Sequence, residues 1–218
     1  MPATEDRARL VLMIEVVCVK HGTKYGPEYV NRLGSMVRRN LTLEHRFHCI
    51  TEDPSGVDAN ILDVHDHQLP GWWQKLTVFK PDPWGLTNPI LFLDLDLVIV
   101  QSLDPLAGHD HDFVIIEDFS HDCYNSSVFW LRPGSHAHVW TDFTTEALER
   151  LQGDQNWITE CIPDATLWPS EWIVSYKRRI RRRGRSNRPL PPEARIVVFH
   201  GNPKPHEVRD AFVREHWR

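Results

Sequence analysis

Two carboxylates stand inside an otherwise apolar stretch of the chain. Asp94 and Asp96 lie in the run ILFLDLDLVIV, residues 90–100, whose other members are all hydrophobic. A run of this composition predicts a buried strand. On an extended backbone, side chains two residues apart leave the same face, so both carboxylates should point the same way while Leu95 packs in the core. Because a buried carboxylate without a partner costs several kcal/mol, the pair must face a compensating charge.

A divalent cation is one partner that keeps two carboxylates close together, and oxygen ligands suit Mg²⁺ or Mn²⁺. His200 ends a second apolar strand, and Lys204 follows it after a Gly-Asn-Pro turn. An imidazole can complete a metal site, and a lysine can reach a phosphate oxygen as a point charge. We therefore predict a metal site of Asp94, Asp96 and His200 that receives a phosphate-bearing ligand. Two alternatives stay open, namely salt bridges between the acidic pair and basic side chains, and a His200 that only packs.

The elements that would position these residues alternate between strands and helices. Besides residues 90–100, strand-like runs cover residues 9–19, 47–50, 113–116, 127–131 and 195–200, and helical periods cover 29–39 and 140–151. This alternation predicts an α/β fold with a mainly parallel sheet, in which ligands gather at the carboxyl ends of strands. A chain of 218 residues is expected to form one domain, residues 1–218.

Composition and charge narrow the functional classes. The chain is 41% hydrophobic and 25% charged, and it has no apolar run long enough to cross a bilayer, so we expect no transmembrane segment. Its four cysteines are far apart, which indicates reduced thiols in a cytoplasmic protein. The basic segment, Lys177 to Arg188, holds 8 of the 25 basic residues. It suits an anionic acceptor, a peripheral contact with a membrane or a solvated loop better than nucleic acid.

Four motifs in order resemble those of a known enzyme family. LFLDLDLVIVQSL, NSSVFWL, DQNWIT and FHGNPKP are similar to motifs of the A-type glycosyltransferases, most nearly family 8, the glycogenin and lipopolysaccharide galactosyltransferase group. The resemblance extends from about Val16 to Pro205. It implies a single-domain, Rossmann-like nucleotide-diphospho-sugar transferase fold. It also implies a metal-dependent enzyme that uses Mn²⁺ or Mg²⁺ to move a sugar from a nucleoside-diphosphate donor, most simply a UDP-sugar, to an unknown acceptor with retention of configuration.

The resemblance also assigns roles to individual residues. It places the metal on Asp94, Asp96 and His200, and the donor diphosphate on Lys204, with Asp94 also approaching the donor ribose. Asp154 and Gln155 would lie beside the reacting sugar carbon, so the catalytic residues it implies are Asp154, Gln155 and Lys204. The remaining donor-binding residues that it implies are Val19, Lys20, His21, Tyr25, Lys75, Asn125, Ser126, Ser127 and Gly201.

Other interpretations of the same residues belong to different functional classes. A haloacid-dehalogenase-type phosphatase also has Asp-x-Asp after an apolar strand, with Asp94 as nucleophile and Asp96 as acid/base, but FHGNPKP has no role in that scheme. A non-catalytic module that binds nucleotide sugars or nucleic acid is the other alternative. Trp168 and Trp172 are candidates for the acceptor side, because aromatic rings stack on sugars. The histidine pairs His65–His67 and His109–His111 resemble metal tracts but suit surface loops better.

Overall fold

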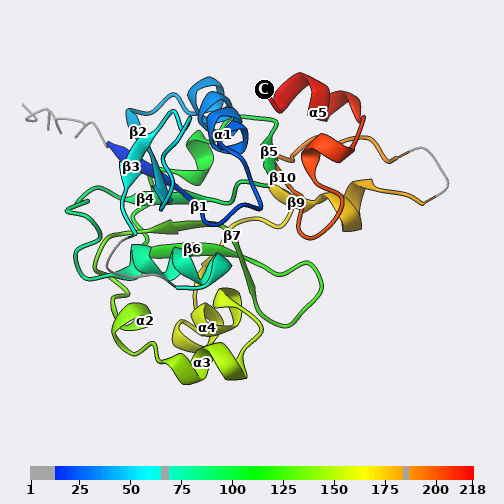
Figure 1. Cartoon of the computed structure of the whole chain (residues 1–218). Helices are drawn as coiled ribbons and strands as arrows, with labels where there is room; N and C mark the ends of the chain where they lie inside the picture. Colours follow the sequence, from blue (N-terminus) through cyan, green and yellow to red (C-terminus); the bar gives the residue numbers. More distant parts are fainter. Residues whose placement is uncertain (1–12, 65–68, 184–186) are drawn as a thin grey trace, which may run out of the picture.

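A seven-stranded sheet forms the centre of the molecule (Figure 1). The computed structural model describes residues 13–64, 69–183 and 187–218. The strand order is β3-β2-β1-β4-β7-β6-β8, and neighbours pair in parallel except β4 with β7 and β6 with β7, so the expected mainly parallel sheet is confirmed. The strands are β1 (Ile14–Lys20), β2 (His45–Thr51), β3 (Asn60–Leu62), β4 (Ile90–Leu93), β6 (Phe113–Glu117), β7 (Tyr124–Leu131) and β8 (Thr166–Leu167).

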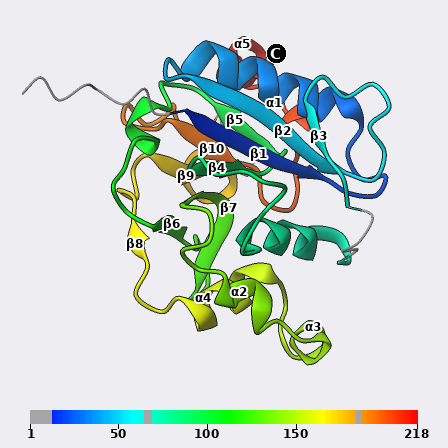
Figure 2. The same ribbon diagram turned by 90° about the vertical axis from the view of Figure 1, so that its left-hand side faces the viewer.

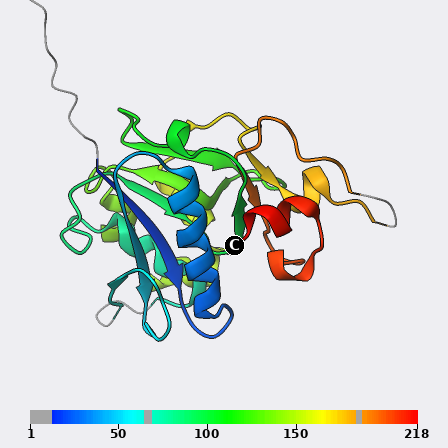
Figure 3. The same cartoon turned by 90° about the horizontal axis from the view of Figure 1, so that it is seen from above.

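A smaller sheet lies beside the first and has the order β5-β10-β9. Its strands are β5 (Leu97–Ile99), β9 (Ile173–Ser175) and β10 (Ile196–Val198). Figure 3 shows it to one side of the large sheet, next to the C-terminal helix α5 (Ala211–His216). Aliphatic residues of β1 and β4 share one hydrophobic cluster with those of β5, β9 and β10, so a common core joins the two sheets.

The prediction of one continuous strand over residues 90–100 was wrong. The run divides into β4 and β5, which belong to different sheets, and the break falls on Asp94, Leu95 and Asp96. The Asp94 N–H donates to Ser127 O at 2.8 Å in the large sheet, whereas the Asp96 carbonyl accepts from Phe199 N at 2.9 Å in the small one. Leu95 between them is buried, as expected. The two carboxylates therefore lie at the joint between the sheets.

Helices cover both faces of the large sheet. Helix α1 (Pro27–Asn40) lies on one face, while the 3₁₀-helix η1 (Gly71–Phe79) and the helices α2 (His138–Thr141), α3 (Thr145–Arg150) and α4 (Asp154–Cys161) lie on the other, as Figures 1 and 2 show. Short helices also occur at η2 (Asp104–Leu106), η3 (Tyr176–Ile180) and η4 (Pro205–Glu207). No described helix has the length and apolar character that a membrane span requires.

The single helix expected over residues 140–151 is also absent, since α2 and α3 are separate. Phe143 lies between them, and its ring contacts Trp73 and Trp157 with centroid distances of 5.5 and 5.7 Å. Packing this partly buried ring against η1 and α4 turns the chain inward. A tertiary contact thus overrides a local helical period.

Helix α1 follows the expected period closely, and its sequence explains both ends. Pro27 occupies the first helical position, where its missing N–H leaves nothing unsatisfied, and Arg38 and Arg39 lie in the last turn, near the negative end of the helix dipole. The apolar face packs on the sheet. At Gly34 the helix comes so close to β2 that an added Cβ would lie 2.8 Å from the Phe47 ring.

Gly34→Ala is expected to destabilise the protein despite the better helix propensity of alanine. Propensity favours Ala by about 1 kcal/mol, but overpacking against a buried ring costs about 1–3 kcal/mol. Urea unfolding should therefore give a lower free energy of unfolding. Arg38→Ala, on the exposed face of the same helix, should change stability by less than about 1 kcal/mol. A stabilised Gly34→Ala variant would contradict the close packing.

Candidate functional site

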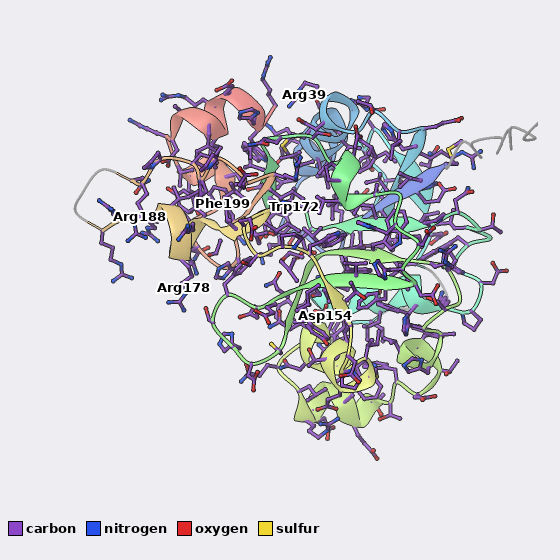
Figure 4. All side chains as sticks on the ribbon, turned by 180° about the vertical axis from the view of Figure 1, so that it is seen from behind. Arg39, Asp154, Trp172, Arg178, Arg188 and Phe199 are labelled. Carbon is purple, nitrogen blue, oxygen red and sulfur yellow. The ribbon has the colours of Figure 1, made fainter. Side chains whose placement is uncertain are left out.

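A cavity of about 560 Å³ opens at the joint between the two sheets. Six segments meet there: the carboxyl ends of β1 and β4, helix η1, the start of β7, the start of α4 and the turn after β10. Because β7 runs antiparallel to β4, its start lies at the same sheet edge as the end of β4. The side of the molecule that carries Asp154 appears in Figure 4. The cavity is lined by Val19, His21, Lys24, Tyr25, Gly71, Trp72, Lys75, Asp94, Leu95, Asp96, Asn125, Ser126, Ser127, Gln152, Gly153, Asp154, Gln155, Asn156, His200, Gly201 and Lys204.

A buried lysine joins two acidic residues on one side of the cavity. Lys75 Nζ lies 3.0 Å from Asp94 Oδ1 and 3.5 Å from Asp154 Oδ2, and it donates to Ser126 Oγ at 3.1 Å. Burial alone would lower the pKa of Lys75, but the charges of Asp154 and Asp94 outweigh it and raise the pKa. Lys75 is therefore a permanent cation that fixes both carboxylates.

A second lysine holds the other aspartate. Lys204 Nζ pairs with Asp96 Oδ2, and the Tyr25 hydroxyl donates to the same oxygen at 3.0 Å. Burial and the nearby Asp96 charge raise the pKa of Tyr25, so its hydroxyl keeps the proton that it donates. Tyr25 and Lys204 come from distant parts of the sequence and meet on one carboxylate.

The three carboxylates of the cavity, Asp94, Asp96 and Asp154, carry more negative charge than Lys75 and Lys204 neutralise. Burial raises the pKa of Asp94 more than Lys75 lowers it, and the charges of Asp96 and Asp154 raise it further. Within the described part of the chain, Asp94 Oδ2 and Asp96 Oδ1 accept no hydrogen bond, because Lys75, Lys204 and Tyr25 all use the other oxygens. Each carboxylate thus retains an oxygen for a further cationic partner.

His200 approaches the cavity from the small sheet. Its Nε2 lies 2.6 Å from Ser175 Oγ, and its ring stacks on Phe119 with centroids 5.3 Å apart. Burial and the neighbouring Lys177 lower the pKa of His200, which favours a neutral imidazole. A neutral imidazole is the form that binds metals.

The polar wall opposite consists of the start of β7 and the start of α4. Ser126 Oγ donates to Asp154 Oδ2 at 2.5 Å, and the Ser127 N–H donates to Asn125 Oδ1 at 3.1 Å. Gln155 follows on α4, where its Nε2 donates to Cys123 Sγ at 3.5 Å. The Asp154 carboxylate is therefore held in place by a hydroxyl and by Lys75.

Comparison with known proteins shows which solved structures have a similar fold. Neither a family model nor a curated protein matches the sequence. Solved structures do match: the glycosyltransferase GlyE of Streptococcus pneumoniae TIGR4 has a TM-score of 0.64 at 14% identity, covering 88% of this chain and 56% of that chain. The galactosyltransferase LgtC, solved with donor and acceptor sugar analogues, has a TM-score of 0.58 at 14% identity and 88% coverage of both chains.

This chain has the A-type glycosyltransferase fold. The bifunctional glycosyltransferase WbbM agrees, with a TM-score of 0.60 at 11% identity over 94% of this chain. The chain spans about half the length of GlyE and WbbM and most of the length of LgtC. The fold expected from the motifs is confirmed.

The residue types at the joint between the two sheets suit a divalent metal ion. Two carboxylates with free oxygens and a neutral imidazole match the ligands that Mn²⁺ or Mg²⁺ takes. All three residues line one cavity, although the described residues contain no ready cluster of three metal-ligating side chains. Lys204 and Lys75 hold the carboxylates instead. Asp94, Asp96 and His200 are therefore the residue types that could bind this ion, and Lys75 and Lys204 occupy one oxygen of each carboxylate.

The structure brings together every site residue expected from the sequence except Lys20. Lys20 is buried and its Nζ donates to Asp53 O at 3.3 Å, away from the cavity. Side chains alternate along β1, so Val19 and His21 face the cavity while Lys20 faces the other side. Trp72 also lines the cavity, although the sequence did not predict it as a site residue. It is a large hydrophobic side chain that is exposed to solvent, and this exposure points to a role in binding.

The other aromatic and histidine candidates lie elsewhere. Trp168 is buried and donates from Nε1 to His109 Nε2 at 3.0 Å, while the Arg195 guanidinium packs over the Trp172 ring. Neither tryptophan lines the cavity: Trp168 is buried in the hydrophobic core, and Trp172 packs against that core while partly buried. The pair His65–His67 lies outside the described residues.

Proposed function

We propose that this chain transfers a sugar from a nucleoside-diphosphate donor, of the UDP type, to an acceptor in a reaction that depends on Mn²⁺ or Mg²⁺. The observation that carries the proposal is the convergence of Asp94, Asp96, His200 and Lys204 on one cavity at the edge of an A-type fold. Its volume of about 560 Å³ is suited to a ligand of this size. LgtC, which has the same fold, was solved with donor and acceptor sugar analogues.

In the proposed reaction the protein mainly stabilises the leaving group. The bond between the sugar carbon and the diphosphate oxygen breaks, the acceptor oxygen forms the new bond, and its proton passes to the departing diphosphate. A metal ion bound by Asp94, Asp96 and His200 would supply positive charge for that diphosphate. Lys204 adds a second cation beside Asp96, and this charge favours the transition state more than the ground state.

The sugar side of the cavity would be served by Asp154 and Gln155. Positive charge grows at the reacting sugar carbon in such transfers, and a fixed carboxylate stabilises it. Ser126 and Lys75 fix the Asp154 carboxylate, while Asn125, Ser126 and Ser127 offer hydrogen bonds to the sugar. Val19, His21 and Tyr25 would face the base, and Gly201 would let the backbone approach the diphosphate. Retention of configuration is part of the proposal.

The fold favours this function over the haloacid-dehalogenase-type phosphatase, because the matched structures are glycosyltransferases. A shared core between the two sheets supports treating residues 1–218 as one domain. Cytoplasmic location, and peripheral membrane contact through the basic segment, stay predictions from the sequence.

Calorimetric titration with UDP tests the proposal. We expect binding with Mn²⁺ present and much weaker binding with a chelator, since the ion bridges the carboxylates and the diphosphate. Asp96→Asn should remove the metal dependence, whereas Asp164→Asn, on an exposed residue that does not line the cavity, should retain it. Transfer of the sugar from UDP-glucose or UDP-galactose to water or an added sugar is the activity readout. UDP binding that ignores metal and Asp96→Asn would refute the site, and binding without any turnover would indicate a non-catalytic module.

A further inference from the structure

A second cavity, of about 430 Å³, lies on the small-sheet side of the molecule. Its wall comes from β9, helix η3, the loop that follows β6 and the loops that precede β9 and β10. The lining residues are Phe119, Ser170, Glu171, Ile173, Val174, Ser175, Arg178, Arg179 and Pro191. None of them belongs to the set that lines the first cavity.

The two cavities nevertheless share a wall. Phe119 lines the second cavity and stacks on His200 of the first, with ring planes 17° apart. Ser175 also lines the second cavity, and its Oγ lies 2.6 Å from His200 Nε2. A ligand in the second cavity would therefore be separated from the candidate donor site by the His200 side chain and its two partners.

Unneutralised positive charge surrounds this second cavity. Within the described residues, no acidic side chain forms an ion pair with Lys177, Arg178 or Arg179. Arg178 donates from Nε to Ser120 Oγ at 3.0 Å, which orients its guanidinium with a neutral partner. Glu171 is the acidic member of the lining. Arg178 lies on the same side of the molecule as Arg188 (Figure 4).

Lys177 extends the positive charge from the second cavity toward the first. Its Nζ approaches Gly201 so closely that a Cβ added there would lie 2.5 Å away. Burial lowers the pKa of Lys177, and the charges of Lys204 and Arg181 lower it further, as expected for cations that crowd together. An anion between the two cavities would relieve this repulsion.

We propose that the second cavity is the acceptor subsite and that it binds a phosphate group on the acceptor. Guanidinium groups bind phosphate through paired, charge-assisted hydrogen bonds, and Arg178 and Arg179 offer two of them in one cavity. A phosphate held there places the adjoining part of the acceptor along Lys177 and Gly201, at the edge of the donor cavity. The inference rests on the proposed function for its role in transfer, but the anion site itself does not require it.

The phosphate could belong to a soluble sugar phosphate or to a lipid-linked one, and both offer the same group. Attraction to a membrane surface as a whole is a different case. It depends on the total charge of the basic segment, and each lysine or arginine near the surface contributes similarly. A subsite depends on the arginines that line the cavity.

Calorimetry with glucose 6-phosphate tests the subsite, with glucose and inorganic phosphate as comparison probes and UDP with Mn²⁺ in the cell. Glucose 6-phosphate and phosphate should bind, and glucose should not. Arg178→Ala/Arg179→Ala should weaken binding by about tenfold or more, because charge-assisted hydrogen bonds are lost. Arg182→Ala/Arg183→Ala removes the same charge from the same segment outside the cavity lining, so it should leave affinity within about twofold. Urea unfolding of both double variants verifies that they fold.

The other outcomes have distinct meanings. Equal weakening by the two double variants would overturn the subsite in favour of diffuse attraction. The subsite would also be overturned if glucose 6-phosphate did not bind and if both double variants weakened binding to vesicles of phosphatidylcholine and phosphatidylserine to the same extent. Binding to vesicles that contain a lipid phosphate, weakened by Arg178→Ala/Arg179→Ala but not by Arg182→Ala/Arg183→Ala, would support a lipid-linked acceptor. If UDP fails to bind while glucose 6-phosphate binds through the arginine pair, sugar transfer is refuted and the anion site stands.

Discussion

Lys75→Met should lower the free energy of unfolding more than any other single substitution in the site. Lys75 Nζ contacts Asp94 Oδ1, Ser126 Oγ and Asp154 Oδ2, and the residue is 4% exposed. Methionine has a similar length but no charge, so two carboxylates would remain close together without their shared cation. Removing one partner of a buried ion pair costs about 3–5 kcal/mol. Urea unfolding at neutral pH should show a loss of this size, with donor binding lost as well.

Lys75→Arg is the matched control for this prediction. It keeps the positive charge at a slightly greater length, so it should retain most of the stability that Lys75→Met loses. A Lys75→Met variant as stable as the natural protein would mean that the carboxylates do not depend on this cation. In that case the buried network around Asp94 and Asp154 would need a different explanation.

Asp154→Asn should reduce sugar transfer by about 10²–10³-fold, the usual effect of removing one fixed electrostatic group from a transition state. Asparagine has the same shape, and its oxygen can still accept the hydrogen bond from Ser126 Oγ. The variant loses the negative charge that would stabilise the sugar carbon and the ion pair with Lys75, which retains Asp94 as its acidic partner. Donor affinity should therefore change little while the rate of transfer falls.

Steady-state and binding measurements together decide this second prediction. The rate is measured with UDP-glucose or UDP-galactose, and the affinity by titration with UDP and Mn²⁺. Asp164→Asn again serves as the exposed control and should match the natural protein in both. An unchanged rate for Asp154→Asn would assign the stabilising role to another group, while equal losses of rate and affinity would make Asp154 a donor-binding residue.

Much of the site could be predicted because its residues occur in short motifs at the ends of apolar runs. Asp94, Asp154, His200 and their neighbours come from four such motifs, and the joint between the two sheets brings them to one cavity. The resemblance implies a donor-binding role for Lys20 together with Val19 and His21. The alternation of side chains along β1 turns Lys20 to the opposite face from Val19 and His21, toward Asp53.

The rest depended on contacts between distant segments, which periodicity does not reveal. An apolar run such as 90–100 looks the same whether it pairs within one sheet or two, and only its partners Ser127 and Phe199 divide it. The second cavity could not be predicted from the sequence for the same reason. Phe119 is far from His200 in the sequence, and nothing local indicates that their rings stack.

The division of the acidic run also has a mechanical consequence. Asp94 is anchored to the large sheet through Ser127, and Asp96 to the small sheet through Phe199. Any ligand that grips both carboxylates therefore acts as a crosslink that couples the two sheets, and a ligand that binds only the folded form raises stability in proportion to the logarithm of its concentration. Separation of the sheets and release of the ligand would then be one event, so saturating ligand should slow amide hydrogen exchange in β10 and β7 together.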